Sequence, residues 1–89
     1  MSEPLKYEIL PEHLRAGMKR YVEHGIRPGS FLCAIIENDL VQAYSRGDET
    51  SLRSMPQIMY FVMTELPSKA FGSPDRVNDW IAATFKPRV

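Results

Sequence analysis

The chain has 89 residues, enough for one small domain, 1–89, and too few for two hydrophobic cores. Eleven basic residues balance eleven acidic ones, and no basic arm is available to bind a phosphate backbone, so general nucleic-acid binding is disfavoured. The longest apolar runs, such as FLCAII, are far shorter than a bilayer span, and the first residues lack the basic-then-apolar order of a signal peptide. We therefore expect a cytoplasmic protein that does not enter a membrane.

The first predicted helix spans 11–24. Residues 1–9 contain Pro4 and show no helical period, so we expect them to form a loosely ordered N-terminal arm. Pro11 suits a first helical turn because the N–H that proline lacks has no partner there. Apolar residues then recur at three- and four-residue steps, and Gly25 is a typical helix end.

The second predicted helix spans 30–46, from Ser30 as N-cap to Gly47 as the residue that ends it. At 100° per residue Asp39 falls within an apolar stripe of this helix, so we expect its carboxylate to face the core. The other members of the stripe are Leu32, Ile35, Ile36, Leu40 and Ala43.

A buried Asp39 carboxylate would need a partner. Two interpretations stay open at this point: an ion pair that fixes the order of the helices, or a charge kept for binding a ligand. The arginines predicted to be within reach are Arg15, Arg20 and Arg53.

The third predicted helix spans 51/55–66, that is, it begins at residue 51 or 55 and ends at 66. The fourth spans 73–85. Ser54 opens a capping box, and Pro56 should begin or kink the third helix. Ser73 is a predicted N-cap followed by proline and aspartate. The predicted inner face of the third helix consists of Met55, Ile58, Met59, Val62, Met63 and Leu66.

Two apolar runs, FLCAII and IMYFVM, could each form a strand by length alone. Both lie inside longer helical patterns that carry caps and stops. We therefore predict an all-α fold, a compact bundle of about four helices.

Three stretches of the chain resemble a group of small uncharacterised proteins of tailed bacteriophages and prophages. They are HGIRPGSFL at 24–32, NDL at 38–40 and GSPDRVNDWIAA at 72–83. The resemblance implies a phage origin, and thus the cytoplasm of a bacterial host cell. It implies no chemistry and no assigned functional residue.

Patterns typical of enzymes are missing from the sequence. No serine lies in a G-x-S-x-G elbow, and Glu37 and Asp39 point about 200° apart on a helix, so they cannot act as a facing pair. Cys33 lies in an apolar run and is expected to be a packed thiol. We expect no enzymatic activity, no cofactor and no metal site.

Apolar residues outside the predicted stripes indicate an interaction surface. Phe31 and Val41 on the second helix and Phe61 on the third lie away from the main apolar faces. A homo-oligomer, a dimer or higher, would bury them. The alternative is that the fourth helix and the N-terminal arm cover them.

Two functions follow as hypotheses. The first is a phage interaction protein that inhibits a host defence or regulatory system by binding a host protein. The second is a small oligomeric binder that sequesters a nucleotide-type signalling molecule, with helix starts and arginines for its phosphate and tyrosines for its base. The candidate binding residues are Arg27, Ser30, Phe31, Asn38, Asp39, Tyr44, Arg46 and Phe61.

Overall fold

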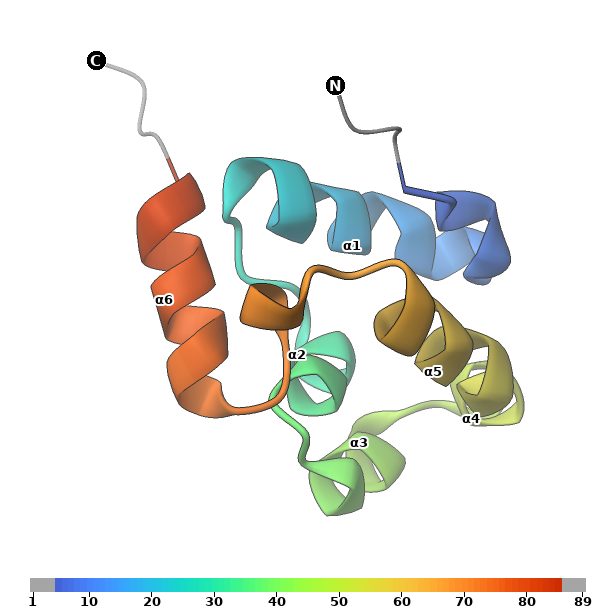
Figure 1. The fold of residues 1–89 in the computed structure, drawn as a ribbon. Helices are drawn as coiled ribbons and strands as arrows, with labels where there is room; N and C mark the ends of the chain where they lie inside the picture. The colour runs from blue at the N-terminus through green and yellow to red at the C-terminus, as the bar shows by residue number, and fades with distance from the viewer. Residues whose placement is uncertain (1–4, 86–89) are drawn as a thin grey trace.

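The computed structural model describes residues 5–85, which form helices and no strand (Figure 1). The all-α prediction is therefore confirmed. The helix count differs from about four because the helix predicted at 30–46 is divided in two and a further short helix, Glu49–Arg53, precedes the one that begins at Met55. None of the described helices is both long and apolar enough to cross a membrane. The elements are η1 (Tyr7–Ile9), α1 (Glu12–His24), α2 (Ser30–Ile36), α3 (Leu40–Arg46), α4 (Glu49–Arg53), α5 (Met55–Thr64), η2 (Ser68–Ala70) and α6 (Pro74–Thr84).

The break between α2 and α3 is a left-handed turn at Asn38, whose φ is 64°. Its N–H donates to the carbonyl of Ile35 at 3.1 Å, and the N–H of Asp39 donates to that of Ala34 at 2.8 Å. This is the Schellman pattern, with asparagine in the position that glycine usually occupies. The Asp39 carboxylate then accepts a hydrogen bond from the backbone N–H of Gln42 at 3.2 Å. One helix ends and another begins within three residues.

The two short helices fold back on each other as an antiparallel pair. A Cβ atom at Gly47, just after α3, would lie 2.6 Å from a ring carbon of Phe31, which is in the first turn of α2. A side chain at position 47 would force the Phe31 ring to move. Ala34 and Ala43 are both buried, and their small side chains allow the two backbones to approach closely. In Figure 1 α3 forms the edge of the molecule, on the far side of α2 from α1.

Tyr21 of α1 connects three elements in the core. Its buried hydroxyl donates to the carbonyl of Ala70 in η2 at 2.5 Å, and its own carbonyl accepts from the indole N–H of Trp80 in α6 at 3.2 Å. Burial raises the pKa of this hydroxyl above its ordinary value. The core residues are Leu10, Met18, Tyr21, Leu32, Ala34, Ile35, Ile36, Ala43, Met55, Ile58, Phe61, Val62, Leu66, Ala70 and Val77.

Several predicted helix ends agree with the structure. Gly25 follows α1 in the left-handed conformation, with φ 65°. The Ser73 side chain accepts from the N–H of Arg76 and caps α6. Pro56 lies in the first turn of α5, where its missing N–H costs no hydrogen bond.

One predicted cap is wrong, and a second lacks its predicted hydrogen bond. Ser30 is the first residue of α2 rather than its N-cap, which is Gly29 and which has no capping side chain. Ser54 is the N-cap residue of α5, as predicted, but it forms no capping box, because its hydroxyl donates to the carbonyl of Thr50, one turn earlier, at 3.1 Å. A serine hydroxyl can accept from a backbone N–H in the following turn or donate to a carbonyl in the preceding turn. The sequence signal does not distinguish these two hydrogen bonds.

Most of the predicted inner face of α5 is buried, namely Met55, Ile58, Val62 and Leu66, but one flank differs from the prediction. Phe61, predicted on a flank and proposed as a binding residue, is fully buried, whereas Met63, predicted inside, is 70% exposed. The cause is η1, whose Tyr7 ring lies 5.6 Å from the Phe61 ring between centroids. Residues 5–9 therefore pack against α5 instead of forming a loose arm, and residues 1–4 lie outside the described part.

The burial of Phe61 predicts a large loss of stability on truncation. We expect Phe61→Ala to lower the free energy of unfolding by about 3–5 kcal/mol, because a large cavity is left in the core. Met63→Ala, two residues away and exposed, should change it by less than about 0.5 kcal/mol. Urea denaturation of the two variants measures both values, and a loss from Phe61→Ala as small as that expected from Met63→Ala would place Phe61 at the surface.

Candidate functional site

An open groove of about 420 Å³ separates α3 from the 27–30 turn and α2. We call it the α2–α3 groove. Four of the predicted binding residues line it, namely Arg27, Ser30, Asp39 and Arg46. The complete lining is Arg27, Pro28, Ser30, Cys33, Ala34, Glu37, Asp39, Gln42 and Arg46.

Arg27 forms one wall of this groove and is held in place by three partners. Its Nη1 lies 3.4 Å from Glu37 Oε2 and 3.3 Å from Cys33 Sγ, and its Nη2 donates to Asn78 Oδ1 at 2.5 Å. Asn78 belongs to α6, so the guanidinium joins α2 to α6. Its donors are mostly used within the protein, which leaves few of them for a ligand.

The charges of the groove are balanced. Arg27 and Arg46 oppose Glu37 and Asp39, and the Nε of Arg46 donates to the Gln42 side chain at 3.0 Å. A phosphate group carrying more than one negative charge would gain little here, because two carboxylates share the site with the arginines. A groove with both arginines and carboxylates can instead hydrogen-bond to the polar side chains of a polypeptide, which include both donors and acceptors.

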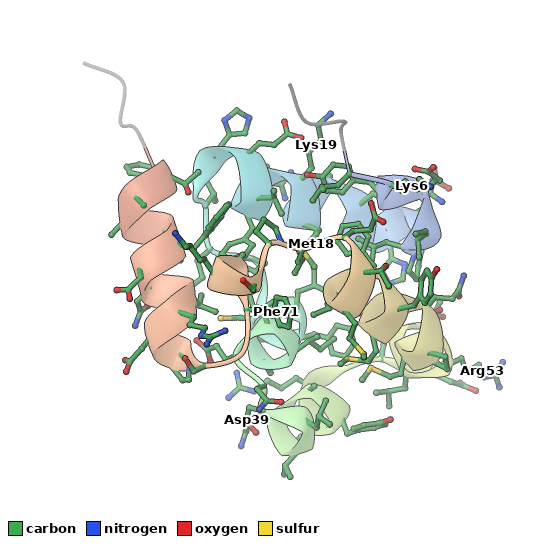
Figure 2. All side chains as sticks on the ribbon, viewed as in Figure 1. Lys6, Met18, Lys19, Asp39, Arg53 and Phe71 are labelled. Atoms are coloured by element: carbon green, nitrogen blue, oxygen red, sulfur yellow. The ribbon has the colours of Figure 1, made fainter. Side chains whose placement is uncertain are left out.

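Asp39 is exposed, and the prediction that its carboxylate faces the core is wrong. Figure 2 shows it at the outer edge of the molecule, where α3 begins. The turn at Asn38 resets the helical phase, so the stripe drawn through 30–46 does not continue across it.

None of the three predicted arginine partners pairs with Asp39, and two of them make other contacts. Arg15 donates to the carbonyl of Leu10 at 2.9 Å, and Arg53 pairs with Glu49 one turn earlier on α4. The structure therefore contains no buried ion pair at Asp39 within residues 5–85. The carboxylate is an N-cap instead.

The outer side of α3 carries three exposed apolar side chains, which we call the α3 ridge. Leu40, Val41 and Tyr44 are 43%, 79% and 55% exposed. At 100° per residue they lie opposite the groove-lining side of the same helix, while Ala43 faces the core. Leu40 was predicted to be buried, and the sequence signal that could have corrected this is the Asn38-Asp39 pair, a helix stop followed by a helix start.

The remaining predicted site residues are not brought to the groove or the ridge. Phe31 is half-buried against Gly47, and Asn38 forms the turn. Phe61 is in the core. Only Arg27, Ser30, Asp39 and Arg46, with Tyr44 on the ridge, belong to this part of the surface.

A histidine, a serine and an aspartate meet where α1 contacts the start of α4. His13 Nε2 lies 2.9 Å from the buried Ser51 hydroxyl oxygen, and Asp48 accepts from the Ser51 N–H at 2.7 Å. The Ser51 backbone N–H, its hydroxyl and the nearby His13 charge lower the pKa of Asp48. In a catalytic triad the carboxylate orients the imidazole. Here it caps α4, so the cluster is a contact between helices.

Within residues 5–85 no three histidine, cysteine, aspartate or glutamate side chains lie close enough together to hold a metal ion. Compared with protein-family models, curated proteins and solved structures, this chain matches none of them. The geometry of the groove and the ridge is thus the basis for a functional proposal.

The capping role of Asp39 predicts a difference between two substitutions. Asp39→Ala should lower the free energy of unfolding by about 1 kcal/mol, because the first turn of α3 loses its cap. Asp39→Asn should change it by only a few tenths, roughly 0.3 kcal/mol, because asparagine caps equally well. Thermal melts compare the two. Losses of about 3 kcal/mol from both would indicate a buried ion pair.

The surroundings of Cys33 predict slow alkylation. Partial burial raises the pKa of its thiol, the Arg27 guanidinium lowers that pKa, the Glu37 carboxylate raises it, and the net shift is upward. At pH 7.5 the thiol should be protonated and should react with iodoacetamide more slowly than a free cysteine peptide does. Glu37→Gln should speed the reaction and Arg27→Gln should slow it. A wild-type rate equal to that of the peptide would contradict this pKa.

Proposed function

We propose that this chain is a non-enzymatic interaction protein that binds a segment of a partner protein across α3. The observation that carries the proposal is the α3 ridge. Single exposed apolar residues are normal on protein surfaces, but Leu40, Val41 and Tyr44 lie together on one side of a seven-residue helix. Contiguous apolar surface on a small protein is typical of an interaction site.

The α2–α3 groove supports the same proposal from the other side of the helix. Interfaces combine an apolar centre with a polar rim that supplies hydrogen bonds. Val41 and Tyr44 would provide the centre. Gln42, which follows Val41 on α3 and lines the groove, would provide polar contacts at the rim.

A homo-oligomer formed through this surface is a weaker proposal. The predicted oligomer depended on Phe31, Val41 and Phe61, and of these only Val41 is freely exposed. A stable interface uses about 20–30 residues on each side, and the ridge offers three apolar ones. A short partner segment, such as one amphipathic helix, fits the size of the ridge better.

For the partner we propose a protein of a bacterial host, and for the effect inhibition of a host defence or regulatory system. The resemblance of 24–32, 38–40 and 72–83 to proteins of tailed phages supports this choice. Inhibition by covering a surface needs no catalytic residue, so a small helical protein can achieve it with a ridge and a groove alone.

A nucleotide-type ligand in the α2–α3 groove is the second candidate function. The concave shape and the presence of Arg27, Ser30 and Arg46 favour it. Glu37 and Asp39 weaken it, because they cancel the positive charge that a phosphate requires.

The test is capture of host proteins from bacterial lysate with matched variants. Val41→Glu and Tyr44→Glu place a charge on the ridge, while Lys19→Glu changes an exposed residue of α1, far from the ridge (Figure 2). All three change exposed positions, so their stability should stay within about 0.5 kcal/mol of wild type. We expect quantitative mass spectrometry to show one host protein captured by wild type and Lys19→Glu and lost from both ridge variants. Equal capture by all four proteins would contradict the proposal.

A further inference from the structure

A second cavity, of about 350 Å³, lies between α1 and the beginning of α2. We call it the α1–α2 pocket. It opens on the side of α2 that carries Phe31 and Leu32, whereas the α2–α3 groove lies on the side of Cys33 and Ala34. The two sites share Ser30 and otherwise have different linings. The lining is His13, Leu14, Ala16, Gly17, Arg20, Gly29, Ser30, Phe31 and Leu32.

The α1 wall of this pocket contains Gly17, in the interior of a 13-residue helix. Glycine at such a position destabilises a helix relative to alanine. The fold does not require it, since a Cβ there would meet only Leu32 Cδ1 at 3.8 Å and Arg20 Nη2 at 4.0 Å, which are ordinary contacts. A side chain at position 17 would instead occupy space in the pocket. The missing side chain suggests that something other than the protein uses this space.

The charge of the α1–α2 pocket differs from that of the α2–α3 groove. Its lining includes the basic residues His13 and Arg20 and no carboxylate. His13 is already in contact with Ser51. Arg20 makes no hydrogen bond or ion pair with any residue in 5–85, and its guanidinium lies beside the open space above Gly17.

We propose that the α1–α2 pocket binds a small anion that carries a flat apolar ring. The ring would lie against Gly17, with Leu14 and Phe31 beside it. The anionic group would pair with Arg20 and accept a hydrogen bond from the Ser30 hydroxyl. Small-molecule sites of about 300–1,000 Å³ combine apolar walls with a few polar groups, and this volume, at the lower end, suits one ring system with one anionic group.

The anion can be a phosphate or a carboxylate, and a titration distinguishes them. The probes are adenosine 5′-monophosphate, benzoate and uncharged adenosine, each added to ¹⁵N-labelled protein and followed by NMR. We expect at least one anion to give saturable shifts at the amides of Gly17, Ser30 and Phe31, and adenosine to bind at least about tenfold more weakly. Shifts with the nucleotide alone indicate a phosphate ligand, and shifts with benzoate alone a carboxylate. No saturable shift from either anion, or equal binding of adenosine, would overturn the proposal.

Two variants test the roles of charge and space. Arg20→Gln should weaken binding of the effective anion by about tenfold or more, whereas Lys19→Gln, its exposed neighbour, should leave it within about twofold. Gly17→Ala should raise the melting temperature and weaken binding, because the helix gains stability while the pocket loses space. Unchanged binding in both Arg20→Gln and Gly17→Ala would refute the site. Val41→Glu should leave this binding intact, so the outcome is independent of the α3 ridge.

Discussion

The left-handed turn at Asn38 is the constraint on which the exposed surface depends. A continuous helix through this region would carry Leu40 into the core and Asp39 with it. Because Asn38 adopts φ 64° and Asp39 caps a new helix, α3 folds back along α2 and exposes one apolar side. Asparagine tolerates this conformation better than other residues with side chains, though less well than glycine. The turn thus has a modest local cost, offset by the packing of α3 against α2.

The all-α architecture and most helix ends could be predicted from local signals in the sequence. Gly25, Pro56 and Ser73 each act through their own backbone geometry or hydrogen bonds, which do not depend on the rest of the fold. The burial of Phe61 could not be predicted this way, because it results from a tertiary contact with Tyr7. The break at Asn38 had a local signal, but the apolar periodicity on both sides of it favoured one long helix.

The candidate sites, too, could be predicted only in part from local signals in the sequence. The sequence indicated Arg27, Ser30 and Arg46 as binding residues, and the structure brings them to one groove. It could not indicate that Glu37 and Asp39 would balance their charge there, since that depends on how α2 and α3 pack. Gly17 had no visible role in the sequence. Its role depends on the open pocket between α1 and α2, which Arg20 also lines.

Backbone NMR of the free protein tests the central claim most directly. The account predicts helical ¹³Cα shifts over 30–36 and again over 40–46, interrupted by a left-handed Asn38, and an Asp39 side chain that behaves as an exposed N-cap. It also predicts that the Leu40, Val41 and Tyr44 side chains show contact with solvent. Uninterrupted helical shifts from 30 to 46 would contradict the account, because a continuous helix would bury Leu40 and leave no α3 ridge.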